Sequence, residues 1–238
     1  MAKFFSDKIR VYFDGYDPGT LTTSVTPNLE VANLDPTCLG DTGRRAVAGV
    51  RQDTLEWAGL YDDSGSDNVD AMATALIGSG AKTVSVLYGT GTGSAAYAGS
   101  AHLHMRRTPV AVADLVRESL TFVMDSKFDK CIVLASKVEA TASGTLGTVD
   151  NAALTTAGGT AYLHVHSYTG TGTAVLGMRH SADGTTWVTL TTANLGTMTG
   201  TKLSTTGTVR RYVQAFASAI TGEPTGDAVT YSIVFNRG

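Results

Sequence analysis

The sequence predicts a mainly β protein with a single α-helix. Only 16% of its 238 residues are charged, 27 are glycines and threonine is frequent, a composition that favours strands and turns over helices. Most apolar residues also recur with a period of two, which is the period of a strand, and only one segment has helical spacing. A chain of this length allows one large domain or two ordinary ones, with enough residues for a substantial core.

Strand segments extend along the whole chain and are separated by turns. In residues 161–168 the alternation is clean, with Leu163 and Val165 on one side of the strand. The other side is a candidate exposed binding face made of Tyr162, His164, His166 and Tyr168. Strands are expected at residues 9–13, 21–31, 54–61, 83–88, 101–106, 114–124, 131–138, 161–168, 175–180, 186–190, 203–217 and 229–235.

The single helix is expected over residues 68–77. Asp67 is the expected N-cap, and Gly78 follows the last turn at the position where glycine commonly ends a helix. Apolar residues fall at helical spacing at Val69, Met72, Ala73 and Leu76. We therefore expect a packing helix that lies on a sheet.

A hairpin is expected where Asp183 and Gly184 separate two strand segments, because Asp-Gly is a strong signal for a tight turn. Trp187, just after the turn, would then lie in the core. The charged residues are concentrated in residues 1–140, and a small, polar segment with glycine follows. The chain is therefore expected to form a domain at 1–140, a linker at 141–145 and an all-β domain at 146–238.

A long excursion occupies residues 33–49, between two strand segments. It contains Pro36 and three glycines, it carries charged side chains such as Asp35, and it has little that could form a core. Structureless loops of this length are uncommon in compact domains, and they usually have a function or are disordered.

The order of residues in and after this loop resembles the major tail (tail tube) proteins of long-tailed, siphophage-like bacteriophages. The resemblance rests on Leu34-Asp35-Pro36-Thr37, Leu39-Gly40-Asp41-Thr42, Arg44-Arg45, Val47-Ala48-Gly49-Val50 and the strand 55–61, with Ala48 where the pattern often has proline. The C-terminal part is similar to jelly-roll or immunoglobulin-like appendages of phage tail proteins, through His180, Ser181, Asp183, Gly184, Trp187, Arg211, Tyr212 and Phe235.

This resemblance implies a tail-tube-type β-sandwich or barrel with one flanking helix, followed by the appendage. Subunits of such a virion protein would form stacked hexameric rings around a lumen that conducts DNA without binding it, and would be assembled in the host cytoplasm. Expected partners are other copies of the chain, the tape measure protein, the tail terminator and the distal tail protein, with no membrane and no cofactor. The implied subunit-interface and stacking residues are Asp35, Thr37, Gly40, Asp41, Thr42, Arg44, Arg45 and Gly49.

Composition limits the other functions. The net charge of −3 gives no basic surface for holding nucleic acid, and the two cysteines suit a reducing compartment. The N-terminus lacks the apolar run of a signal peptide. No nucleophile-elbow motif is present, so we expect no enzymatic activity. Two alternatives stay open: a surface glycan-binding module that uses the 162–168 face, and a metal-dependent enzyme built on the pairs His102/His104 and His164/His166.

Overall fold

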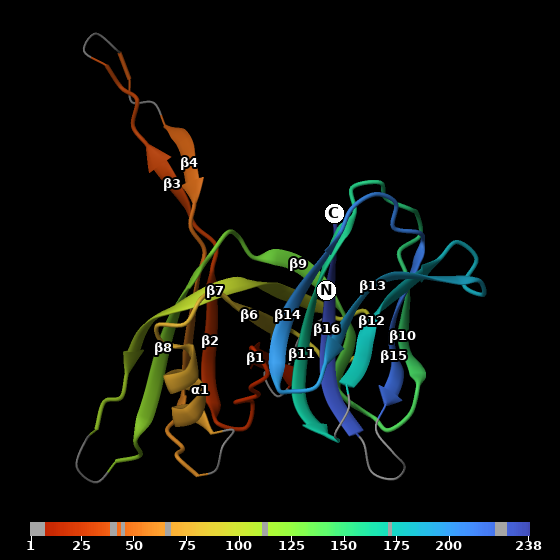
Figure 1. The fold of residues 1–238 in the computed structure, drawn as a ribbon. Coiled ribbons are helices and arrows are strands. Elements are labelled where there is room, and N and C mark those ends of the chain that lie inside the picture. Colours follow the sequence, from red (N-terminus) through yellow and green to blue (C-terminus); the bar gives the residue numbers. More distant parts are fainter. Residues whose placement is uncertain are drawn as a thin grey trace. The chain divides into compact units, whose positions relative to one another are not determined.

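The computed structural model describes residues 8–38, 42–43, 46–64, 68–110, 114–170, 173–221 and 228–238. It confirms a mainly β fold, with strands β1 to β16 and one short helix, α1, in the described chain (Figure 1). Two compact units are present: unit 1 combines Met1–Gly19, Lys82–Ala98 and Asp129–Gly238, and unit 2 combines Thr20–Ala81 and Gly99–Phe128. The described chain contains no helix with the length and apolarity that a membrane crossing requires.

Unit 1 contains two antiparallel sheets and a covering strand pair. One sheet has the order β14-β11-β16-β9, and the first residues of β7 pair with β9. The second sheet has the order β10-β15-β12-β13, and β1 pairs with β6. The bounds are β1 (Arg10–Phe13), β6 (Lys82–Leu87), β7 (Ala95–Arg107), β9 (Asp129–Ala140), β10 (Gly144–Asp150), β11 (Gly159–Thr169), β12 (Thr173–Ser181), β13 (Trp187–Leu195), β14 (Thr199–Thr205), β15 (Tyr212–Thr221) and β16 (Ala228–Arg237).

The main core of unit 1 lies between its two sheets, which Figure 1 shows as separate layers. Leu163 and Val165 of β11 meet Leu176 and Met178 of β12 in this core, all fully buried. A second cluster lies on the other face of the β9–β11–β16 sheet, where Tyr12 of β1 joins residues of β6, β7, β9 and β16. The sheet in the middle is therefore buried on both faces.

Unit 2 is a smaller sheet with the helix beside it. The later residues of β7 pair with β8, and the order continues through β5 to β2 at the edge. A separate two-stranded sheet is formed by β3 and β4. The bounds are β2 (Thr22–Asn28), β3 (Val31–Leu34), β4 (Val47–Arg51), β5 (Thr54–Leu60), α1 (Val69–Leu76) and β8 (Arg117–Met124).

The helix forms as its sequence predicts, with one difference at its start. Val69, Met72, Ala73 and Leu76 are all buried, and Gly78 has the positive φ of +71° that favours glycine after a helix. The N-cap is Asn68 rather than Asp67, and Oδ1 of Asn68 accepts a hydrogen bond of 2.6 Å from the amide of Ala71.

The hairpin predicted at Asp183-Gly184 is confirmed, since β12 and β13 pair up to Ser181 and Trp187. Oδ1 of Asp183 accepts hydrogen bonds from the amides of Thr185 and Thr186, which fixes the turn. The placement of Trp187 in the core is wrong. Its side chain is half-buried, because it shares the outer face of the sheet with Arg179 and not the inner face of Met178.

The segment 141–145 is exposed. Its first three residues connect β9 to β10 and its last two begin β10, and both strands belong to unit 1. β9 pairs with β16 through Ala140 and Val229, and Leu134 of β9 lies in the same core as residues of β12 and β15. Strands on both sides of the segment are therefore part of one compact unit. The separation of residues 1–140 from 146–238 stays a prediction, which cleavage within the segment can test.

Candidate functional site

The candidate assembly site is the hairpin of β3 and β4 in unit 2. Its register pairs Val31 with Arg51 and Leu34 with Val47, and within the described residues neither strand pairs with a third. Figure 1 shows both strands extending beyond the end of β2, on the side away from α1. A two-stranded hairpin that stands alone is only marginally stable in water, so this one requires either a strong anchor or a partner.

Apolar side chains are exposed along the whole hairpin. Val50 is 82% exposed, and four further apolar residues around it are between 45% and 57% exposed: Leu29, Val31, Leu34 and Val47. Every residue of β3 is exposed. Isolated exposed apolar residues are normal, but several on both faces of one projecting strand pair are typical of an interaction surface. Exposed strand edges add unpaired backbone groups to the same surface.

Buried Asp53 anchors the base of the hairpin. Its carboxylate accepts hydrogen bonds from Nε of Arg51 at 2.7 Å, from the amide of Phe128 at 2.8 Å and from the amide of Glu30 at 3.3 Å. Its carbonyl oxygen accepts from the amide of Met124 at 3.0 Å. Burial by itself would raise the pKa of the Asp53 carboxyl, but these hydrogen bonds hold that pKa below its usual range. The carboxylate therefore joins Glu30 and Arg51, at the base of the hairpin, to Phe128, which follows β8.

The predicted loop 33–49 is shorter than expected, because its two ends are strands. Asp35 and Thr37 follow β3 and are exposed, and the side chain of Asp35 accepts hydrogen bonds from the amide and hydroxyl of Thr37. Those bonds lower the pKa of the Asp35 carboxyl. Thr42 is exposed. A Cβ on Gly49 would lie 2.9 Å from the carbonyl oxygen of Ala32, so this position favours glycine.

Four of the predicted interface residues lie outside the described residues: Gly40, Asp41, Arg44 and Arg45. The structure therefore does not test the ion pairing expected of Asp41 with Arg44 or Arg45. Sequence reasoning missed Asp53, Val31 and Val50, which form the base and the exposed surface of the hairpin.

The binding face predicted on residues 162–168 is wrong, since its residues are not exposed. Tyr162, His164 and His166 are buried, and Tyr168 is half-buried. The hydroxyl of Tyr162 donates to Oδ2 of Asp129 at 2.6 Å. The physical reason is that β1 and β6 cover this face of β11, so the alternating strand has no solvent-facing side.

His164 and His166 both have their ring nitrogens engaged by the protein. His164 bonds to the hydroxyl of Ser85 at 2.7 Å and to the carbonyl oxygen of Asp14, and His166 bonds to the carbonyl oxygen of Gly15 at 2.8 Å and to Ser232 at 2.9 Å. Burial lowers the pKa of His164 to about 3, and the neighbouring His166 contributes. Burial also lowers the pKa of His166. These rings are neutral structural groups whose nitrogens cannot also coordinate a metal.

The other histidine pair, His102 and His104, is exposed on β7. Nε2 of His102 lies 3.7 Å from Oδ1 of Asp125, which is too far for a hydrogen bond. In the ranges that the structure describes, no group of three or more His, Cys, Asp or Glu side chains is arranged to hold a metal ion.

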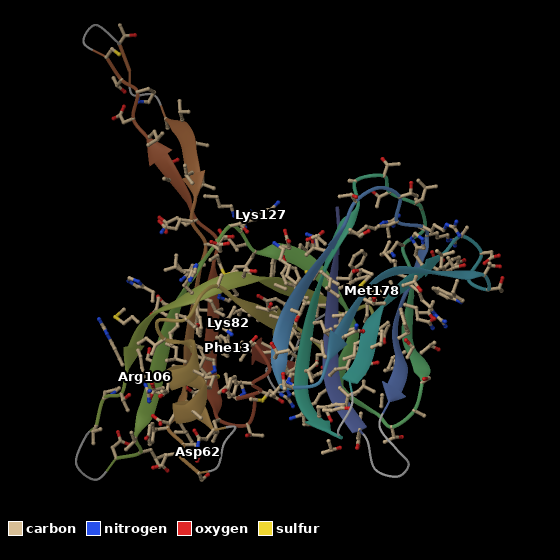
Figure 2. All side chains as sticks on the ribbon, in the orientation of Figure 1. Phe13, Asp62, Lys82, Arg106, Lys127 and Met178 are labelled. Carbon is tan, nitrogen blue, oxygen red and sulfur yellow. The ribbon has the colours of Figure 1, made fainter. Side chains whose placement is uncertain are left out.

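An ion-pair network fixes α1 to its sheet. The guanidinium of Arg106, labelled beside α1 in Figure 2, donates to buried Glu118 on β8 and to Asp70 on the helix, both at 2.5 Å. A third bond of 3.1 Å reaches the hydroxyl of Thr74. These contacts give Arg106 a role within unit 2 and fix the position of the helix.

The chain was compared with family models, curated proteins and solved structures. No family model matches the chain, and neither does any curated protein. Solved structures to which it is similar include chains from phages and from gene transfer agent particles. The alignment with the tail of an empty gene transfer agent particle, solved with C6 symmetry, has 14% identity and a TM-score of 0.39, and covers 53% of this chain and 97% of the other.

Two further structures align along nearly the whole chain. The SPP1 Dit protein, described as a hub of the adsorption apparatus of phages that infect Gram-positive bacteria, aligns at 12% identity with a TM-score of 0.38, over 96% of this chain and 98% of the other. A chain of the phage p2 baseplate in its activated conformation aligns at 11% identity with a TM-score of 0.32, over 97% and 98%.

Proposed function

We propose that this chain is a structural protein of a phage tail, which assembles into stacked hexameric rings that form the tail tube. The observation that carries the proposal is the projecting hairpin with its exposed apolar residues. Val50 and Leu34 would lose most of their contact with water if the hairpin packed on a copy of the chain in the next ring. Burying a side chain of this kind contributes about 1.5–3 kcal/mol. A surface costly to leave in water would thus become the stacking contact.

Ring closure requires a second kind of contact, in which one surface of a subunit meets a different surface of its neighbour. β2 forms an edge of the unit 2 sheet, since β5 is its one strand partner among the described residues. An open edge is a template for pairing with another chain, and a closed ring removes such edges. Six subunits per ring follow from the resemblance to tail tube proteins.

The charge distribution suits a conduit for DNA. Residues 1–140 contain most of the charged side chains and carry the net negative charge of the chain. Negative groups along a lumen repel phosphates, so DNA would pass without binding. The tape measure protein would occupy this lumen before ejection, and the terminator and distal tail proteins would close the two ends of the tube. The site of action would be the virion, after assembly in the host cytoplasm.

The stacking residues predicted from the sequence refine this proposal. Asp41 is proposed to pair with Arg44 or Arg45 across the contact between rings. Breaking one side of a partly buried pair costs about 3–5 kcal/mol. Asp41→Ala and Arg45→Ala should leave circular dichroism and the melting temperature unchanged and reduce tube formation in sedimentation. Normal tubes from both variants would contradict this role.

Negative-stain electron microscopy of the purified protein tests the proposal. We expect rings with six subunits, or tubes of stacked rings, at concentrations where the chain remains soluble. A monodisperse monomer at every concentration and salt condition tried would contradict it. Rings that never stack would support ring formation but would overturn the stacking role assigned to the hairpin.

A further inference from the structure

A cavity of about 460 Å³ lies on the outer face of the β10-β15-β12-β13 sheet in unit 1. The strand register places Arg179 and Trp187 on the same outer face, because Arg179 pairs with Thr189 and Ser181 pairs with Trp187. The volume is within the range of sites for small molecules. Its walls consist of Ser143, Gly144, Thr145, Arg179, Trp187, Thr189, Phe216, Ala217 and Ser218.

The guanidinium of Arg179 is held in place before any ligand arrives. Its Nε donates to Oε1 of Gln214 at 2.8 Å, and Nε2 of Gln214 donates to the hydroxyl of Thr148 at 2.8 Å. Gln214 is buried, so its amide has a fixed orientation and fixes that of Arg179 in turn. The described residues provide no hydrogen-bond partner for either Nη nitrogen of Arg179, and these two nitrogens form a planar fork, the geometry that binds carboxylate or phosphate with two hydrogen bonds.

Aromatic side chains form the apolar part of the cavity. The Cζ of Arg179 lies 5.2 Å from the centre of the Trp187 ring, which holds the indole on the face of the sheet and leaves it half-buried. Phe216, which pairs across the ladder with Gly177, adds a largely buried phenyl ring to the lining. An accessible indole on a sheet surface offers stacking area to a flat apolar face of a ligand.

We propose that this cavity binds an anionic saccharide unit, in which a sugar ring carries a carboxylate or a phosphate. The lining contains one cation and no carboxylate, so its charge complements an anion. A pyranose ring has an apolar C–H face that would lie against Trp187, while its hydroxyl groups would meet the hydroxyl-bearing wall of Thr145, Thr189 and Ser218. This site differs from the buried 162–168 face, and the proposal does not depend on ring assembly.

Fluorescence titration of the full chain tests the proposal with glucuronic acid, glucose 1-phosphate, glucose and inorganic phosphate as probes. Trp57 is fully buried, so Trp187 reports most of any ligand-dependent change in emission and acrylamide quenching. We expect saturable binding of both anionic sugars, at least tenfold tighter than that of glucose or of phosphate. Arg179→Gln and Trp187→Leu should each weaken this binding at least tenfold, with calorimetry replacing fluorescence for the tryptophan variant.

Arg211→Gln is the matched control, because Arg211 is an exposed arginine that precedes β15, lies over Tyr212 and is outside the cavity lining. It should bind both sugars as the unmodified chain does. The proposal is overturned if neither anionic sugar binds, if phosphate alone binds as tightly as glucose 1-phosphate, or if the Arg179 variant retains full affinity while circular dichroism shows it folded. Ring formation in the same samples reports separately on the assembly role.

Discussion

The side chains of Arg51 and Asp53 meet where β4 ends and β5 begins, with Nε of Arg51 donating to Oδ1 of Asp53 at 2.7 Å. Asp53 is fully buried, whereas the side chain of Arg51 is 36% exposed. The same carboxylate accepts from the amide of Phe128, 75 residues further along the chain. This short-range pair therefore connects the exposed hairpin to the core of unit 2.

Asp53→Asn should lower the free energy of unfolding by about 2 kcal/mol at pH 7, because a hydrogen bond to a charged group contributes about 1.5–3 kcal/mol. The folded-state pKa of this carboxyl is lowered, so its contribution is present above the unfolded pKa of about 3.9 and is lost as pH falls through the folded pKa. Urea unfolding between pH 7 and pH 2 measures both effects. Asp35→Asn, at an exposed carboxyl, is the control. Equal loss in the two variants would contradict the anchoring role.

Because His164 is buried, we expect a second decrease in the free energy of unfolding as pH falls. Its folded-state pKa is about 3, against an ordinary value of 6.5, because burial disfavours the charged ring. The unfolded chain binds a proton below pH 6.5 while the folded chain does not, so this stabilisation is complete above pH 6.5 and declines as pH falls towards 3. In His164→Gln the unfolding free energy should change less with pH over that interval. The same slope as in the unmodified chain would contradict this account.

Limited proteolysis tests the domain division predicted at residues 141–145. The segment is exposed, so the first cut should occur there. The two fragments should nevertheless elute together, because β9 remains paired with β16 and contributes Leu134 to the shared core. A first cut inside β11 or β16 would contradict the prediction that the segment is the accessible point. Fragments that separate and stay folded would show two independent domains.

The local features of this fold could be predicted from sequence, whereas the packing of distant strands over one another could not. The helical spacing that ends at Leu76 and the Asp183-Gly184 turn depend on neighbouring residues, and both were predicted correctly. The burial of His164 depends on β1, with a contact to Asp14 that spans 150 residues. An alternating strand does not reveal whether a second layer covers its polar side.

No sequence motif reveals that Asp53 is an anchor, because two of its partners, Met124 and Phe128, lie far along the chain, at and after the end of β8. The β3–β4 hairpin could not be predicted from the sequence for a different reason. Val31, Leu34, Val47 and Val50 are interrupted by glycine and polar residues, and an exposed strand pair lacks the inside–outside alternation by which strands are predicted.

The exposed apolar hairpin is proposed to stack one ring on the next. The variant to test is Leu34→Asp/Val50→Asp, in which both changed side chains are exposed in the free chain, 57% and 82% respectively. The folded subunit should keep its melting temperature, because neither residue lies in a core. Leu154→Asp is the matched control, since Leu154 is 62% exposed and lies in unit 1, outside the hairpin.

Analytical ultracentrifugation over a concentration series measures the assembly directly. Loss of about 1.4 kcal/mol per contact raises the concentration needed for assembly tenfold. We predict that the double variant requires at least a tenfold higher concentration than the unmodified chain to form tubes, while Leu154→Asp assembles normally. A folded double variant that forms tubes at the same concentration as the unmodified chain would contradict the account.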